Sequence, residues 1–229
     1  MELRAHWKAY LVGAVLLVAV LAIGGPFVYA RYLAPEAAAP LSVGTPPQSA
    51  APIGQLASAY VVGPGSEAGY RVSEVLTGQR IDAVGRTPDV TGSVQTADTR
   101  VTAGEITVDM RTVKSDQSRR DEYFTGNLME TARYPNAVFT LTQPVDLGAE
   151  FTSSGPVTVD AMGTLMVKDV TRQVTFPLTA VRDGDTIDVS GAVPVTFTDF
   201  GIEPPSFGDF VRVDPTGQIE FLLMLSPTG

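Results

Sequence analysis

The chain has 229 residues, of which 44% are hydrophobic, and it carries a formal net charge of -9. This acidic balance excludes nucleic acid as a partner, because phosphate backbones need clustered lysine and arginine side chains. The chain contains no cysteine, which excludes disulfides, thiolate nucleophiles and a lipid-modified N-terminal cysteine. Its 22 glycines and 17 prolines suit one β-rich domain of ordinary size with appendages.

The first predicted element is a run of 22 uncharged residues from Ala9 to Ala30. As a helix it would extend about 33 Å, which matches the hydrocarbon thickness of a bilayer. Arg4 and Lys8 precede it, so the positive-inside rule predicts that residues 1–8 stay in the cytoplasm and that the remainder is exported. We expect a single-pass membrane anchor. The alternative is a cleaved secretory signal ending near Val28-Tyr29-Ala30, which would leave the protein secreted.

Residues 31–59 form a predicted linker, because they hold five prolines and no hydrophobic period. We expect a disordered spacer that holds a following domain, residues 60–229, away from the membrane surface. In polyproline form this stretch would reach at most about 90 Å.

Alternating apolar and polar residues, the period of a half-buried strand, recur through residues 60–229. The runs lie at 70–76, 106–111, 137–142, 157–167, 174–178, 187–197 and 219–225. Asp183-Gly184 predicts a hairpin turn between two of them. Such a set without βαβ spacing predicts an antiparallel sandwich or barrel, and periodicity does not choose between the two. Pro177 and Pro194 lie inside strand patterns, so we expect a bulge or a strand end at each.

A charged insert interrupts this pattern after residues 106–111. Residues 114–122 carry six charges in nine positions, more than a core-facing strand could bury. Apolar residues from Tyr123 to Met129 then follow at roughly helical spacing, which predicts a short amphipathic helix or turn. Tyr134-Pro135 ends the insert, because proline disfavours helix at the residue before it.

Short motifs around this insert occur in the order found in a known family. They are Val108-Asp109, Ser115-Asp116, Arg120-Asp121, Tyr134-Pro135 with Phe139, Gly163-Thr164-Leu165 with Val170-Thr171, and Asp199-Phe200-Gly201. From about Tyr60 to Leu225 the chain resembles the YceI family of polyisoprenoid-binding proteins. The resemblance implies an all-β fold, a lipocalin-like antiparallel barrel of about eight strands with a long isoprenoid or other lipid tail in its interior.

The resemblance also assigns a structural motif to Asp116, Arg120, Asp121, Tyr134 and Pro135. For the Arg120-Asp121 pair, the favoured interpretation is a salt-bridged clasp that holds the insert against the barrel. The chain departs from the family at two points. Many members carry Asn-Arg before Asp-Phe-Gly, where this chain has Thr196-Phe197-Thr198, and the histidine common near the first strand has no match.

Candidates for lining a lipid cavity are the bulky residues of the predicted inward faces and of the loop after the Asp-Phe-Gly motif. They are Tyr70, Val72, Phe124, Phe139, Leu141, Leu165, Phe176, Phe197, Phe200, Phe207, Phe210 and Phe221. The residues by themselves favour a packed core, whereas the resemblance favours a cavity. We expect the loop that carries Phe200, Phe207 and Phe210 to be either a lid or a plug. Arg71 and Arg86 are candidates for contact with a charged lipid head group.

Catalytic machinery is not recognisable in the sequence. The sole histidine, His6, precedes the apolar run and cannot serve an exported site as base or metal ligand. We therefore expect a protein that is not an enzyme and that uses no cofactor and no metal, although a pair of carboxylates acting as acid and base stays open. The leading hypothesis is a membrane-tethered lipid-binding barrel. The alternative is a cell-envelope adaptor with a packed interior and a protein partner, bound through residues 116–122.

Overall fold

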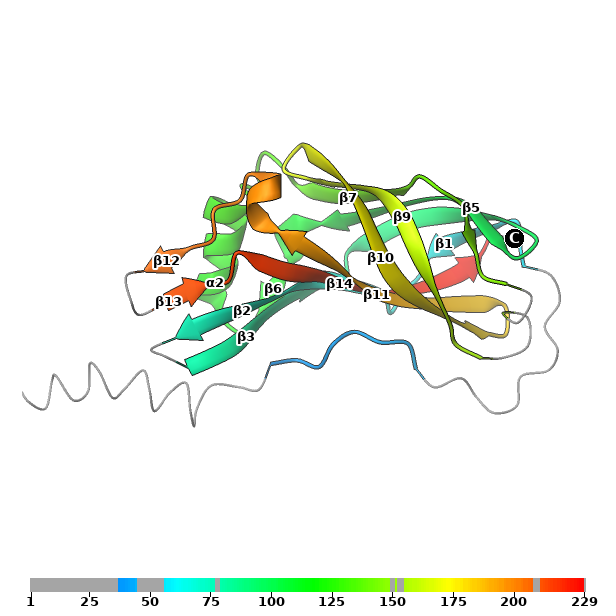
Figure 1. The fold of residues 1–229 in the computed structure, drawn as a ribbon, viewed down its shortest axis with the longest axis horizontal. Helices are drawn as coiled ribbons and strands as arrows, with labels where there is room; N and C mark the ends of the chain where they lie inside the picture. The colour runs from blue at the N-terminus through cyan, green and yellow to red at the C-terminus, as the bar shows by residue number, and fades with distance from the viewer. Residues whose placement is uncertain are drawn as a thin grey trace, which may run out of the picture.

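The computed structural model describes residues 37–44, 56–76, 79–148, 151, 155–207 and 211–228. Most of the regular structure in these parts is antiparallel sheet (Figure 1). The strands are β1 (Ala59–Val62), β2 (Glu67–Leu76), β3 (Gln79–Thr87), β4 (Val90–Ala97), β5 (Arg100–Asp109), β6 (Lys114–Ser115), β7 (Asn136–Leu141), β8 (Val145–Asp146), β9 (Val157–Val167), β10 (Val170–Asp183), β11 (Thr186–Thr196), β12 (Ser206–Phe207), β13 (Val211–Val213) and β14 (Thr216–Pro227). The short helical elements are η2 (Met110–Thr112), α2 (Ser118–Tyr123), η3 (Phe124–Leu128) and η5 (Phe197–Phe200).

These strands close into an eight-stranded antiparallel barrel. Two of the eight wall strands are each interrupted and therefore consist of two consecutive strands. One is made of β1 and β2, and the other is made of β3 and β4. β14 pairs with β2 in its first half and with β1 in its second half, and β4 pairs with β1 on the other side. The strands β5, β7, β9, β10 and β11 complete the circuit. The expected barrel is therefore confirmed, and a flat sandwich is excluded.

The charged insert forms the short helical segment that the sequence predicts. α2 runs into the π-helical turn η3, and β6 adds Lys114 and Ser115 to the ladder of β3. In Figure 1 this segment lies at the same end of the barrel as β12 and β13. The predicted hairpin is also present, because β10 and β11 pair up to Asp183 and Thr186 with Gly184 at φ +60° between them.

The expectation of a bulge or a strand end at Pro177 and Pro194 is wrong. Pro177 pairs with Asp160 inside the ladder of β9 and β10, and Pro194 pairs with Gln218 inside the ladder of β11 and β14. The ladder between β10 and β11, however, covers only Leu178–Asp183 and Thr186–Gly191. Each proline thus has one side without a strand partner, where a missing N–H costs no ladder hydrogen bond.

Part of the predicted linker packs against the barrel. Residues 37–44 run as an extended segment along the outer face of the sheet, and we call them the strap. Leu56 and Ala57 already pack against the core, ahead of β1. For these residues the expectation of a free spacer is wrong, and the rest of the predicted linker before Leu56 lies outside the described residues.

The predicted membrane span, residues 9–30, lies outside the described residues as well. Among the helices of the parts that the structure describes, none has the length and apolar character needed to cross a bilayer.

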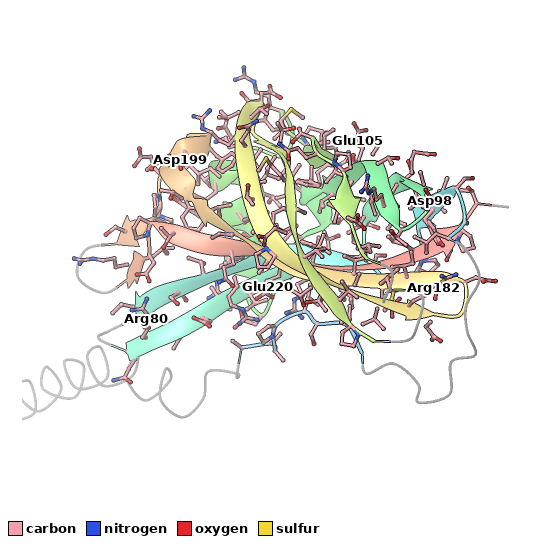
Figure 2. All side chains as sticks on the ribbon, turned by 45° about the vertical axis from the view of Figure 1, so that its right-hand side comes forward. Arg80, Asp98, Glu105, Arg182, Asp199 and Glu220 are labelled. Carbon is pink, nitrogen blue, oxygen red and sulfur yellow. The ribbon has the colours of Figure 1, made fainter. Side chains whose placement is uncertain are left out.

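The two faces of the barrel wall differ in chemistry. Inward positions carry the apolar core, whereas charged side chains such as Arg80, Glu105 and Asp199 stand on the outside (Figure 2). This division follows from the two-residue period of the strands. It leaves the interior as the place where an apolar ligand could bind.

Candidate functional site

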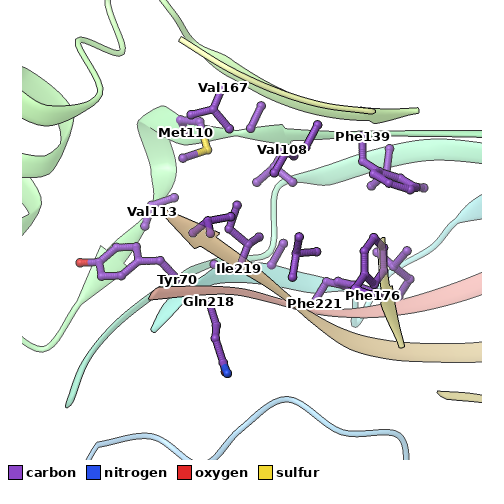
Figure 3. Close-up of a pocket in the computed structure, with 18 of the residues that line it drawn as sticks. Tyr70, Val108, Met110, Val113, Phe139, Val167, Phe176, Gln218, Ile219 and Phe221 are labelled. Carbon is purple, nitrogen blue, oxygen red and sulfur yellow. The ribbon is translucent and has the colours of Figure 1, made fainter. Parts of the chain in front are cut away.

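An apolar cavity of about 310 Å³ occupies the interior of the barrel. Alternate residues of the strands line it, and on β14 these are Ile219, Phe221, Leu223 and Leu225. Figure 3 shows Val108 and other residues on one side of the cavity, opposite Phe221. Small-molecule sites span roughly 300 to 1,000 Å³, so the volume suits one slender ligand. The interior is thus hollow, and the packed core that the residues alone favoured is wrong.

Glycines on neighbouring strands let the large aromatic rings lie flat against the wall. A Cβ built on Gly85 would lie 2.4 Å from the Tyr70 ring, and one on Gly163 would lie 2.4 Å from the Phe139 ring. A Cβ built on Gly191 would likewise lie 2.7 Å from the Phe221 ring, and one built on Gly217 would lie 2.7 Å from the Phe197 ring. Because each ring occupies the space of an absent side chain, it leaves the middle of the barrel empty.

Ten of the cavity candidates line this space. They are Tyr70, Val72, Phe124, Phe139, Leu141, Leu165, Phe176, Phe197, Phe200 and Phe221. Phe176 packs edge to face against Phe139 at 5.4 Å and against Phe221 at 5.7 Å between ring centroids. The side chain of Phe207 and the whole of Phe210 lie outside the described residues, so the choice between lid and plug stays a prediction for them.

One end of the cavity is less covered than the other. At the end near β1 and β8, Tyr60, Leu147 and Phe151 are each at most 4% exposed and close the interior. At the opposite end the lining residues Tyr123, Leu128, Ile202, Pro204 and Pro205 are only half-buried. We call this second end, defined by those five residues, the mouth.

The charged groups of the lining, Glu74 and Arg120, lie near the mouth. Arg120 of α2 donates to the Glu74 carboxylate of β2 at 3.0 Å and also pairs with Asp116. Tyr70 stacks on Phe124 with ring centroids 5.1 Å apart, and its hydroxyl end points away from the middle of the cavity (Figure 3). A ligand with its tail inside would thus place its polar end beside a charge pair and a phenol.

These groups have shifted acidities. Burial, the largest influence, raises the pKa of Tyr70 to about 12, because the phenolate would lose hydration. Burial works to lower the pKa of Arg120, but the carboxylates of Glu74 and Asp116 outweigh it and raise that pKa. At neutral pH the mouth therefore presents a neutral phenol and a fixed cation held between two acidic residues.

A family model for the YceI-like domain matches residues 61–224, which is most of the chain. The chain belongs to the YceI-like family. This match confirms the resemblance in the motifs and covers every strand of the barrel except the ends of β1 and β14.

Solved structures agree with this assignment at the level of the fold. A polyisoprenoid binding domain from Saccharophagus degradans, implicated in plant cell wall breakdown, is 18% identical with a TM-score of 0.60 over 75% of this chain and 99% of that one. BcnA from Burkholderia cenocepacia is 19% identical with a TM-score of 0.53 over 68% of this chain and 95% of that one. No curated protein matches the chain.

The two head-group candidates of this YceI-like domain do not lie in the cavity. Arg71 and Arg86 project from the outer face and both bind the Glu220 carboxylate, with the Arg71 Nε at 2.5 Å and the Arg86 Nη2 at 3.1 Å. The expectation that they contact a head group is wrong for a ligand in the barrel. The reason is strand parity, because Tyr70 faces inward and its neighbour must then face outward.

The structural motif of the family joins the insert to the barrel, with different partners from those expected. Arg120 bridges to Glu74 and Asp116, whereas Asp121 accepts from the Ser115 amide at 2.8 Å and from its hydroxyl at 2.7 Å. In the same motif, Arg133 lies over the Tyr134 ring at 4.9 Å and the Met110 amide donates to the Pro135 carbonyl. The expected clasp is present, with Glu74 as the partner on the barrel side.

Sequence reasoning missed two parts of the YceI-like site. Glu74 lies in the predicted strand at 70–76, but the sequence does not identify it as the partner of Arg120, because their pairing depends on how the insert folds back. The strand glycines at 85, 191 and 217 were not recognised as wall positions. Their signal is available in sequence, because a glycine inside a strand pattern indicates close approach of another group.

Proposed function

We propose that this YceI-like domain binds a single isoprenoid or similar lipid tail in its barrel, outside the cytoplasmic membrane and tethered by the N-terminal apolar run. The observation that carries the proposal is the apolar cavity with one less covered end. Membership of the YceI-like family supports it, as does the fold shared with a polyisoprenoid binding domain.

Energetics favour a carrier that exchanges its ligand with a membrane. Moving a CH2 group from water into an apolar site is worth about 0.8 kcal/mol, but a tail that leaves a bilayer was already in hydrocarbon. The net free energy of transfer is then small. Selectivity must come from the shape of the tail, which the flat aromatic walls limit to one slender chain, and from the head group at the mouth.

The charges at the mouth favour a neutral head group. Glu74 and Asp116 contribute two negative charges against the single positive charge of Arg120. A phosphate placed there would meet net negative charge in a partly desolvated position, which is unfavourable. An alcohol, amide or carbonyl head could instead hydrogen-bond to the Tyr70 hydroxyl or to the guanidinium.

The membrane tether and the export of the domain are supported by the sequence. The 22 uncharged residues before Arg31 are long enough to span a bilayer. Arg4 and Lys8 precede this run, and the positive-inside rule predicts that the segment that carries them stays in the cytoplasm. A tether would raise the local concentration of lipid at the domain without tightening the site.

Native mass spectrometry of the full-length protein tests the binding. The protein is purified from the membranes of the producing cells, delipidated, and incubated with a linear isoprenoid alcohol of four isoprene units. We expect one bound alcohol per chain. Ala161→Trp fills the cavity from an inward position of β9, whereas Thr158→Trp adds the same ring at an exposed position of the same strand.

The pair of variants separates cavity binding from surface binding. We expect Ala161→Trp to lose the bound alcohol and Thr158→Trp to retain it. Equal retention in both would place the alcohol elsewhere, and no uptake by the unaltered chain would favour a protein partner in place of a lipid ligand. Circular dichroism of each variant checks that the barrel is folded.

A further inference from the structure

The strap is held on the outer face of the barrel by specific hydrogen bonds. The carbonyl of Ala38 accepts from the Arg71 guanidinium at 2.6 Å, and the carbonyl of Ala39 accepts from the Arg86 guanidinium at 2.5 Å. At the other end, the Val43 amide donates to the Ser190 hydroxyl at 3.1 Å. These contacts reach strands β2, β3 and β11, so the strap crosses a wide part of the wall.

A buried ion cluster lies under the strap. Glu220 points outward from β14, yet its side chain is only 4% exposed, because Arg71 and Arg86 pair with its carboxylate and in turn bind the strap. A buried carboxylate is tolerated when cations and hydrogen bonds compensate for the lost hydration. Both arginines therefore do two things: they neutralise Glu220, and each donates from its Nη2 atom to a backbone carbonyl of the strap.

We propose that the strap is a docking device that holds the mouth side of the barrel toward the membrane. This inference rests on the proposed tether, because it needs the apolar run of residues 9–30 to be the membrane anchor. It adds that the barrel is held close to the bilayer in one orientation. A free spacer would let the barrel tumble.

Chain length gives the first argument. Residues 31–59 as a free spacer would reach up to about 90 Å from the membrane. With the strap docked, only seven residue steps separate Ala30 from Ala37, which is at most about 25 Å of fully extended chain. Docking thus shortens the maximum reach of the tether more than threefold.

The direction of the strap gives the second argument. Its first part lies at Arg71 and Arg86, which bind Glu220, and its last part lies at Ser190 of β11, so the strap crosses β14. Along β14 it advances from the level of Glu220 to that of Leu222, the partner of Ser190, and thus away from the start of that strand. β14 begins beside β13 and η5 at the mouth. Glu220 lies closer than Leu222 to the start of β14, so the Ala38 end of the strap lies closer to the mouth than its Val43 end. The strap therefore begins on the mouth side of the barrel.

The test inserts the same flexible segment at two places. Ten glycine and serine residues are added either before the strap, between residues 36 and 37, or after it, between residues 50 and 51. The chain lacks cysteine, so Glu203→Cys beside the mouth and Asp98→Cys at the opposite end each give one site for a fluorophore. The full chain is reconstituted in lipid vesicles that carry a quencher in the head-group region.

We expect strong quenching at position 203 and weak quenching at position 98. The insertion before the strap should reduce quenching at position 203 at least twofold, whereas the insertion after the strap should leave it unchanged. Equal effects of the two insertions, or equal quenching at both positions, would overturn the docking proposal. Release of the unaltered chain from vesicles by high-salt washing would instead count against the tether and hence against the proposed function.

Discussion

At the scale of single residues, the hollow interior depends on glycines such as Gly191. A methyl group there would lie 2.7 Å from the Phe221 ring and 3.0 Å from the Pro177 carbonyl oxygen. We expect Gly191→Ala to push the ring toward the middle of the cavity, to destabilise the fold by about 1 to 3 kcal/mol, and to weaken retention of an isoprenoid alcohol. Chemical denaturation and native mass spectrometry measure the two effects.

Gly155→Ala is the matched control, because no atom lies within 4 Å of a Cβ built at that glycine. It should change stability by less than about 0.5 kcal/mol and should leave lipid retention as it is. If the two variants behaved alike, the rings would not need the glycines to lie flat.

We expect the stability of the folded protein to depend on pH through Tyr70, which is again an effect of a single residue. Burial raises its pKa to about 12 in the folded protein, from the value of 10.0 for an exposed tyrosine. The folded state therefore holds this proton more tightly, so the corresponding stability is fully present below pH ~10 and is lost between about pH 10 and 12. Between these two pH values the free energy of unfolding of the unaltered protein should fall by about 2 to 3 kcal/mol relative to that of Tyr70→Phe.

Urea denaturation of both proteins across this range measures the loss, and a phenolate absorbance titration locates the pKa. If the difference in stability between the two proteins stayed constant from pH 9 to 12, Tyr70 would titrate normally. The six other tyrosines titrate in both proteins and cancel in the comparison.

At the scale of elements, the insert depends on the pair formed by Arg120 and Glu74. Glu74 is 9% exposed, so Arg120→Ala leaves a mostly buried carboxylate without its cation. We expect a destabilisation of about 1 to 3 kcal/mol. Amide hydrogen exchange should accelerate in α2 and η3 more than in β9 and β10, because the lost contact joins the insert to the barrel.

The double variant Glu74→Gln with Arg120→Met provides the control for this element. It removes both charges while keeping similar volumes, and it should recover a large part of the stability that Arg120→Ala loses. Failure to recover would mean that the interaction of Arg120 with Asp116, and not the unpaired Glu74, carries the effect.

Strand periodicity predicted β2, β5, β7, β9, β10, β11 and β14, because the burial of alternate residues is a local property of the chain, but it predicted neither β3 nor β4. It predicted β9 almost to the residue, and it placed Phe139 and Phe221 on inward faces. It misjudged Pro177, because the end of the ladder between β10 and β11 depends on neighbours far apart in sequence. Docking of the strap was not predicted either, since its backbone carbonyls carry no sequence signal.

At the scale of the whole molecule, the barrel followed from family resemblance more than from periodicity. Alternation suits a sandwich and a barrel equally, and the choice depends on whether β1 and β14 meet. The hollow interior was also beyond pattern reasoning. An inward aromatic such as Phe197 fills a core or lies against a wall according to its neighbour, here Gly217 on the next strand.

Ligand binding in a cavity that spans the barrel should stabilise the whole molecule. Once the free ligand concentration exceeds the dissociation constant, each further tenfold rise in that concentration adds about 1.4 kcal/mol to the free energy of unfolding. This increment corresponds to a rise of roughly 3 to 6 °C in Tm for a domain of this size. We expect delipidated protein to show this rise with an isoprenoid alcohol of four isoprene units. The filled variant Ala161→Trp should show no rise, while Thr158→Trp should follow the unaltered chain. A similar rise in Ala161→Trp would mean that the stabilising site lies outside the cavity, and the lipid-binding proposal would then lose its structural basis.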